Sequence, residues 1–64
     1  MNQTLTGKFI AHKRKEKNLT QEQLAEKLYV SRTAISKWES GKGYPNIESL
    51  KCISRVLDVS IDDL

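Results

Sequence analysis

The chain has 64 residues, enough for one small domain but not for a catalytic cleft with its own supporting scaffold. Its one cysteine, Cys52, excludes an intrachain disulfide and a zinc site of the CxxC type. The formal net charge of +3 is distributed unevenly, because residues 1–42 carry nine Lys/Arg and four Glu, a net charge of +5. This basic part of the chain suits a polyanionic partner, and a solvated basic face is the alternative.

The first predicted helix runs from about Thr6 to Lys17. Asn18 follows it and can take the left-handed conformation that ends a helix. Thr20 to Gln23 then form a capping box, in which the Thr20 hydroxyl and the Gln23 side chain each bond the backbone of the other residue. The second helix therefore extends from this box to about Leu28, with Leu24, Ala25 and Leu28 on one face.

A third helix is predicted over roughly Ser31 to Ser40. Ser31 is a suitable N-cap, and Gly41 is a natural C-terminal stop. The apolar side of this helix consists of Ala34, Ile35 and Trp38. For Trp38 core packing is the favoured interpretation, although its indole N–H could also reach a phosphate.

The last third of the chain predicts a turn and two further helices. Gly43-Tyr44-Pro45 forms the turn, and Asn46 caps a fourth helix. The inward side of this helix is predicted to hold Ile47, Leu50, Ile53 and Leu57. Ser60, followed three residues later by Asp63, opens a short fifth helix.

The second and third helices are joined only by a short segment that contains Tyr29 and Val30. Two short helices linked in this way cross steeply instead of lying antiparallel. Ala25 sits where the two helices approach, and Val30 fills the junction. The outer face of the third helix is left with donors and short hydroxyl side chains that suit base edges and phosphates, namely Arg32, Thr33, Ser36 and Lys37.

Two runs of the sequence carry a family resemblance: Leu19-Thr20-Gln21-Glu22-Gln23-Leu24-Ala25-Glu26-Lys27-Leu28 and Val30-Ser31-Arg32-Thr33-Ala34-Ile35-Ser36-Lys37-Trp38-Glu39-Ser40-Gly41. Together they closely resemble the phage-repressor/Cro-like (xenobiotic-response-element type) helix-turn-helix family. The resemblance extends from about Gly7 to Leu64. It implies an all-α, five-helix, lambda-repressor-like DNA-binding domain whose third helix reads the major groove. Residues 1–64 would form this single domain, with the motif at about 20–41, as the N-terminal part of a longer regulator or on their own.

The same resemblance assigns roles to individual residues. Base contacts fall to Arg32, Thr33, Ser36 and Lys37, with Arg32 the first choice for a guanine because its guanidinium can bond O6 and N7 together. Gln21 matches a glutamine that bonds a DNA phosphate, and simple helix capping is the alternative. Further phosphate candidates are Ser31, Lys42, Tyr44 and Asn46. Arg14 and Glu39 match a structural ion pair that ties the first helix to the end of the third.

Three residues depart from the family pattern. Tyr29 stands where the family most often has glycine, so this tyrosine must tolerate the left-handed conformation or the turn must differ. Lys13 occupies a position where the family often has an aliphatic residue, and Ser54 one where it often has alanine. Because none of the three lies on the outer face of the third helix, we expect them to affect stability rather than function.

The function predicted by the resemblance is sequence-specific binding of double-stranded DNA by a cytoplasmic, nucleoid-associated transcriptional regulator, most simply a repressor of bacterial or phage type. One recognition helix covers too few base pairs for a unique site, so we expect a homodimer on a pseudo-palindromic operator. The alternatives are an antitoxin that represses its own operon and a protein-interaction module of the same fold. No cofactor, metal, small-molecule site or membrane contact is expected.

An enzyme is the class that the sequence supports least. His12, the one histidine, is expected to be an exposed residue on a basic helix with no carboxylate arranged around it. Cys52 lies off the inward side of the fourth helix and has no histidine near it in the helical register. Without a Gly-rich phosphate loop or a cluster of metal ligands, the chain shows no pattern that carries catalytic chemistry.

Overall fold

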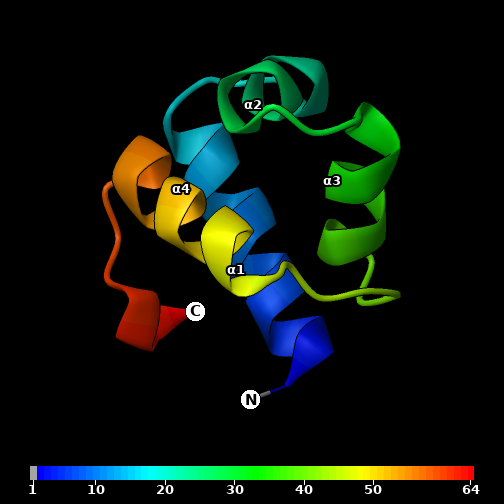
Figure 1. The fold of residues 1–64 in the computed structure, drawn as a ribbon, viewed down its shortest axis with the longest axis vertical. Coiled ribbons are helices and arrows are strands. Elements are labelled where there is room, and N and C mark those ends of the chain that lie inside the picture. The colour runs from blue at the N-terminus through cyan, green and yellow to red at the C-terminus, as the bar shows by residue number, and fades with distance from the viewer. Residues whose placement is uncertain (1) are drawn as a thin grey trace.

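Four α-helices and one 3-10 turn make up the computed structural model, which describes residues 2–64. The helices are α1 (Gln3–Glu16), α2 (Gln21–Leu28), α3 (Arg32–Glu39) and α4 (Ile47–Leu57), and the 3-10 turn is η1 (Ile61–Asp63). In Figure 1, α1 runs through the middle of the molecule, α2 lies across the top, α3 stands at the right, and α4 overlaps α1 in this view and extends to the left. The all-α prediction is therefore confirmed.

The prediction of a fifth helix is wrong. Asp58 adopts a left-handed conformation with φ 56°, which ends α4, and the Ser60 hydroxyl then caps the next turn by accepting from the Asp62 amide. The amides of Asp63 and Leu64 bond the carbonyls of Ser60 and Ile61, three residues back. This i to i+3 pattern defines a single 3-10 turn instead of an α-helix.

The first helix begins earlier than the sequence pattern predicted. The Asn2 side-chain oxygen accepts from the amides of Thr4 and Leu5 at 2.9 and 3.1 Å, so α1 starts at Gln3 and not at Thr6. The apolar pattern does not reveal this cap, because the first apolar pair, Phe9 and Ile10, comes well after Asn2. The end of the helix agrees with the prediction, since Asn18 has a φ of 58°.

The remaining helix starts follow the predicted caps. In α2 the capping box is complete, with Thr20 Oγ1 accepting from the Gln23 amide at 3.0 Å and Gln23 Oε1 accepting from the Thr20 amide at 2.9 Å. Ser31 caps α3 by accepting from the Ala34 amide at 3.1 Å. Asn46 caps α4 by accepting from the Ser49 amide at 2.8 Å. Each side chain pairs a backbone donor that the helix itself leaves unsatisfied.

The core lies where the four helices meet. Its fully buried side chains are Ile10, Leu24, Ile35, Ile53 and Leu57. Ile47 was predicted to face inward with the rest of α4, but it is 59% exposed. The covered part of α4 begins only at Leu50, so the first residue of the helix projects beyond the packed region.

Gly7 allows α1 and α3 to approach closely. A Cβ built on this residue would lie 2.0 Å from the Trp38 carbonyl oxygen, so the backbone of α1 contacts the backbone of α3 directly. The resulting α1–α3 contact fixes where α3 stands. The C-terminal turn also closes onto α1, because the Thr6 hydroxyl donates to the Leu64 carbonyl at 2.9 Å.

Candidate nucleic-acid interface

The outer face of α3 carries four polar side chains, all of them exposed: Arg32, Thr33, Ser36 and Lys37. The opposite face of the same helix is buried, with Ile35 at 0% and Trp38 at 8% exposure. Core packing of Trp38 is thus confirmed. Because a helix of eight residues is anchored by one apolar side, its polar side is held outward as a fixed surface.

The turn between α2 and α3 sets the direction of that surface. Tyr29 ends α2 in the left-handed conformation, with φ 58° and ψ 41°, and the Val30 amide bonds the Ala25 carbonyl at 3.1 Å. Ala25 is 4% exposed, so its small side chain lies within the packed core, beside the turn. Of the two expected alternatives, Tyr29 therefore tolerates the left-handed conformation.

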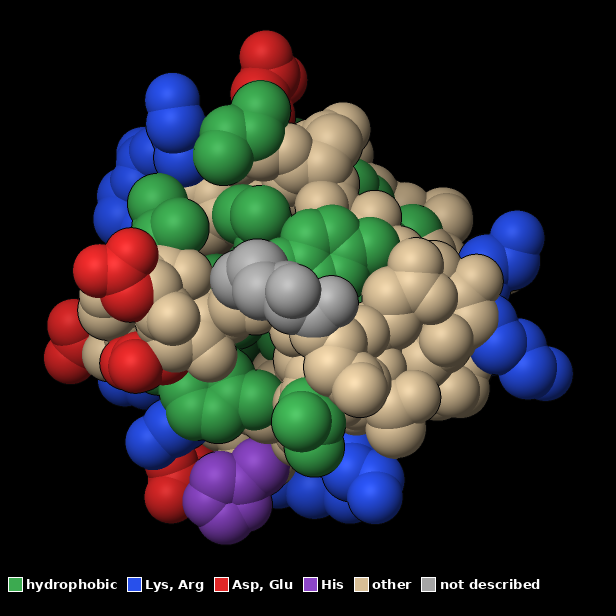
Figure 2. Space-filling view, turned by 90° about the horizontal axis from the view of Figure 1, so that it is seen from below, with side chains coloured by type: hydrophobic (Ala, Val, Ile, Leu, Met, Phe, Trp, Pro, Cys, Tyr) green, Lys and Arg blue, Asp and Glu red, His purple; other side chains and the backbone are tan. Residues whose placement is uncertain are grey.

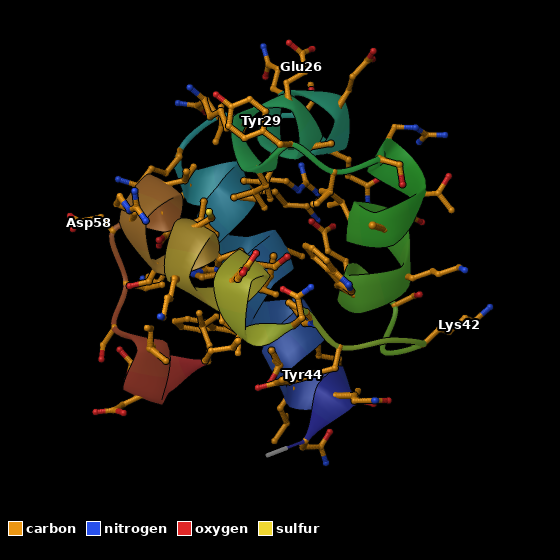
Figure 3. All side chains as sticks on the ribbon, in the orientation of Figure 1. Glu26, Tyr29, Lys42, Tyr44 and Asp58 are labelled. Atoms are coloured by element: carbon orange, nitrogen blue, oxygen red, sulfur yellow. The ribbon has the colours of Figure 1, made fainter. Side chains whose placement is uncertain are left out.

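The predicted phosphate candidates differ in their freedom to contact a ligand. Lys42 is exposed and points away from the body of the molecule beyond the end of α3 (Figure 3). Ser31 and Asn46 use their side-chain oxygens to cap α3 and α4. The Tyr44 hydroxyl donates to the Leu64 carbonyl at 3.2 Å, which turns it toward the C-terminal turn. Of these four, Lys42 is thus the one whose charged group faces solvent.

Arg14 and Glu39 form the ion pair that the sequence predicted. Arg14 Nε lies 2.7 Å from Glu39 Oε2, and Arg14 Nη2 lies 3.0 Å from Glu39 Oε1. This bidentate salt bridge joins α1 to the end of α3. The side chains are only 11% and 8% exposed. Arg14 Nη1 also donates to the Leu19 carbonyl at 2.7 Å. The pair therefore joins α1, α3 and the segment that leads into α2.

Gln21 makes a contact that the sequence did not predict. Its side-chain Nε2 donates to Glu39 Oε1 at 3.0 Å, which links the first residue of α2 to the last residue of α3. The two residues lie 18 positions apart, so no local pattern could reveal the bond. It brings a predicted phosphate contact and a predicted structural ion pair into one network.

The exposed side of α1 holds a second group of charges, away from this network. His12 Nε2 and Lys13 Nζ each lie 3.2 Å from a carboxylate oxygen of Glu16. The prediction that His12 has no carboxylate near it is therefore wrong, because residues four apart on a helix are neighbours. The hydrogen bond from Lys13, helped by the charges of Lys13 and His12, lowers the pKa of Glu16 below its ordinary value of 4.5.

Charge is distributed unequally over the surface. Figure 2 shows Lys and Arg side chains projecting at the edge of the molecule that carries α3, with no acidic side chain beside them in this view, while at the opposite edge acidic side chains gather with further Lys and Arg side chains among them. This arrangement of charges fits a basic, outward-facing helix that approaches a polyanion from one side.

Among residues 2–64, no helix is long and apolar enough to cross a bilayer.

Comparison with known proteins gave one family and several relatives. A family model described as helix-turn-helix matches residues 10–64. The chain is 83% identical over 48 residues to the HTH-type transcriptional activator BcrR of Enterococcus faecalis, an alignment that covers 75% of this chain and 24% of that protein. It is 44% identical over 55 residues to the cryptic phage CTXphi transcriptional repressor RstR of Vibrio cholerae, covering 86% of this chain and 49% of that protein.

A solved structure has the same fold. The restriction-modification controller protein C.AhdI from Aeromonas hydrophila matches with a TM-score of 0.87 and 21% sequence identity, covering 95% of this chain and 92% of that one. At this identity the likeness concerns the fold alone. The chain spans about a quarter and about half of the lengths of the two relatives above.

Proposed function

The chain belongs to the helix-turn-helix family, and from this premise we propose that it binds double-stranded DNA in a sequence-specific manner through α3 and so regulates transcription. The observation that carries the proposal is the outer face of α3, where four polar side chains stand exposed on a helix whose other side is buried. The names of the two relatives support it, since both are transcriptional regulators.

Base readout falls to Arg32, Thr33, Ser36 and Lys37, which share this outer face. Arg32 lies in the first turn of α3, where the recognition helix of such a motif contacts base edges, and its planar guanidinium suits the two acceptors of a guanine. Thr33 offers a methyl group to a thymine methyl. Ser36 and Lys37 lie one turn further along and reach either a base or a phosphate.

Phosphate contacts fix the position of the domain on the duplex without reading sequence. We assign them to Gln21, Ser31, Lys42, Tyr44 and Asn46. The assignment is supported best for Lys42, whose ammonium group projects into solvent beyond α3. For Tyr44 it requires the hydroxyl to leave or share its bond to Leu64.

Residues 1–64 would act as the DNA-binding domain of a longer regulator, as the partial coverage of both relatives suggests. The direction of regulation stays a prediction. A repressor was predicted from the sequence, yet an activator and a repressor are both similar to this chain. We place the domain in the cytoplasm, at the nucleoid, and the proposal requires no cofactor.

The proposal is tested by selecting bound sequences from a random duplex library and measuring affinity for the selected duplex. Arg32→Ala should weaken binding by roughly 5- to 100-fold and relax the sequence preference at one position. Lys42→Ala should weaken binding to all duplexes alike and reduce the slope of log K against log salt by about 0.9. Lys51→Ala, at an exposed lysine of α4, is the matched control and should change neither.

Two outcomes would contradict the proposal. One is the absence of any enriched sequence together with no salt-dependent binding to duplex DNA. The other is a loss of affinity in Lys51→Ala as large as that in Lys42→Ala, which would mean that total positive charge and not the α3 side of the molecule determines binding.

A further inference from the structure

The amide group of Gln21 is held in one orientation by its partner. A carboxylate accepts hydrogen bonds and has no proton to donate, so only the NH2 end of the Gln21 side chain can face Glu39 Oε1 at 3.0 Å. An NH2 group carries two protons. One of them is used by Glu39, and the second is left to donate to another acceptor, because Gln21 is only partly buried.

The carboxylate that orients this amide is itself fixed. Glu39 receives two bonds from Arg14, at 2.7 and 3.0 Å, and its side chain is only 8% exposed. Arg14 is anchored in turn by donating to the Leu19 carbonyl at 2.7 Å. The arginine also compensates the charge of Glu39, so a phosphate next to Gln21 would face a neutral ion pair instead of a bare carboxylate.

We propose that Glu39 is a positioning residue for the DNA contact: held by Arg14, it aims the second N–H of the Gln21 amide at a backbone phosphate beside the first turn of α2. This role rests on the proposed function. It assigns the Arg14–Glu39 pair an effect on affinity in addition to its effect on folding. A fixed amide binds more tightly than a free one because less side-chain freedom is lost on binding.

A double-mutant cycle tests the coupling. Arg14→Met/Glu39→Met removes the acceptor without changing the net charge, and replacing both partners of a buried ion pair by apolar side chains often preserves the fold. Affinity for the selected duplex is measured for this variant in the Gln21 background and in the Gln21→Ala background. We expect the paired substitution to weaken binding roughly fivefold more in the first background than in the second.

The salt dependence gives an independent readout. Because the Gln21 amide is neutral, Gln21→Ala should lower affinity without changing the salt slope, unlike Lys42→Ala.

Gln23→Ala is the matched control for the double-mutant cycle, since Gln23 lies in the same turn of α2 but bonds the Thr20 amide instead of Glu39. In the Gln23→Ala background the paired substitution should weaken binding as much as it does in the wild type.

A measurement on the unaltered chain covers the case in which the paired variant fails to fold. In proton–nitrogen NMR spectra, one Gln21 side-chain proton should be hydrogen-bonded in the free protein and stay nearly unshifted on DNA binding. The other should shift when the duplex is added. If both protons move together, or if neither is bonded in the free protein, the positioning role is refuted.

The outcomes separate this inference from the proposed function. If the wild type binds no duplex, the proposed function fails. If the wild type binds DNA and the paired substitution weakens binding equally with Gln21 or Ala at position 21, only the positioning role fails. A lower melting temperature with unchanged affinity of the folded protein also refutes it, because that result assigns Glu39 to folding alone.

Discussion

Tyr29 shows how a single backbone conformation affects the stability of the motif. Its φ of 58° lies in the left-handed region, where a side chain crowds the backbone and glycine does not. The side chain is 94% exposed, so its packing cannot offset that strain. The turn keeps its form because the hydrogen bond from Val30 to Ala25 closes the end of α2.

Tyr29→Gly should therefore stabilise the domain. We expect a gain of about 1 kcal/mol, which for a domain of this size raises the melting temperature by roughly 4–8 °C. Thermal unfolding followed by circular dichroism measures this change. Affinity for DNA should stay the same, because Tyr29 is not on the outer face of α3. A lower melting temperature in the glycine variant would contradict the strain argument.

Loss of Glu39 should weaken folding strongly, because its side chain is largely buried and paired with Arg14. Glu39→Ala leaves the Arg14 guanidinium poorly paired in a largely buried site and should reduce the free energy of unfolding by roughly 3–5 kcal/mol. Urea denaturation at neutral pH gives the value, and Glu22→Ala, at an exposed glutamate, serves as the control. If Glu39→Ala leaves the free energy of unfolding unchanged, the ion pair has no structural role.

At the scale of the elements, the position of α3 depends on how closely α1 approaches it. Gly7 permits contact between the two backbones, and the Arg14–Glu39 pair ties the same two helices. Gly41, with φ 77°, then ends α3 in a conformation that glycine adopts freely. The outer face of α3 thus depends in part on contacts made by Gly7 and Arg14, which lie outside the helix-turn-helix segment.

Gly7→Ala tests this contact. Alanine favours an isolated helix by about 1 kcal/mol over glycine, so local propensity alone predicts stabilisation. The new Cβ would lie 2.0 Å from the Trp38 carbonyl oxygen, and α1 and α3 would have to separate. We expect a net loss of roughly 1–3 kcal/mol in chemical denaturation. Lys8→Ala, at the exposed neighbouring residue, should change stability by less than about 0.5 kcal/mol.

At the scale of the whole molecule, size limits what one copy can recognise. The domain measures 25 × 22 × 21 Å, and successive major grooves on one side of a duplex are about 34 Å apart. A single domain of this size reaches one groove with α3 and cannot reach the next. Two copies related by a twofold axis would place two recognition helices on one face of the DNA.

We therefore predict that two copies bind one pseudo-palindromic operator, with half-sites about one helical turn apart. Analytical ultracentrifugation of the protein with the selected duplex should give a complex of two chains per duplex. Moving the half-sites apart by about five base pairs, half a helical turn, should abolish this complex, because the two recognition helices would then face opposite sides of the DNA. A one-to-one complex on the intact operator would refute the dimer.

The sequence alone determined α2, α3 and α4, their caps and the motif. N-cap side chains, the capping box and Gly41 act within a few residues, so their effect follows from local chemistry and was predicted correctly. The apolar spacing of α3 likewise separated its buried side from the polar side that we assign to DNA. Asn2 and the final turn were misjudged where the apolar pattern is short.

The tertiary structure decided the features that join distant residues. The bond between Gln21 and Glu39, the backbone contact at Gly7 and the closure of Thr6 onto Leu64 each connect separate elements. Such contacts depend on how the helices cross, which no local spacing encodes. The sequence thus identified which side chains form the polar outer face of α3, which we propose for DNA recognition, and the packing of α1 against α3 determined how that face is held.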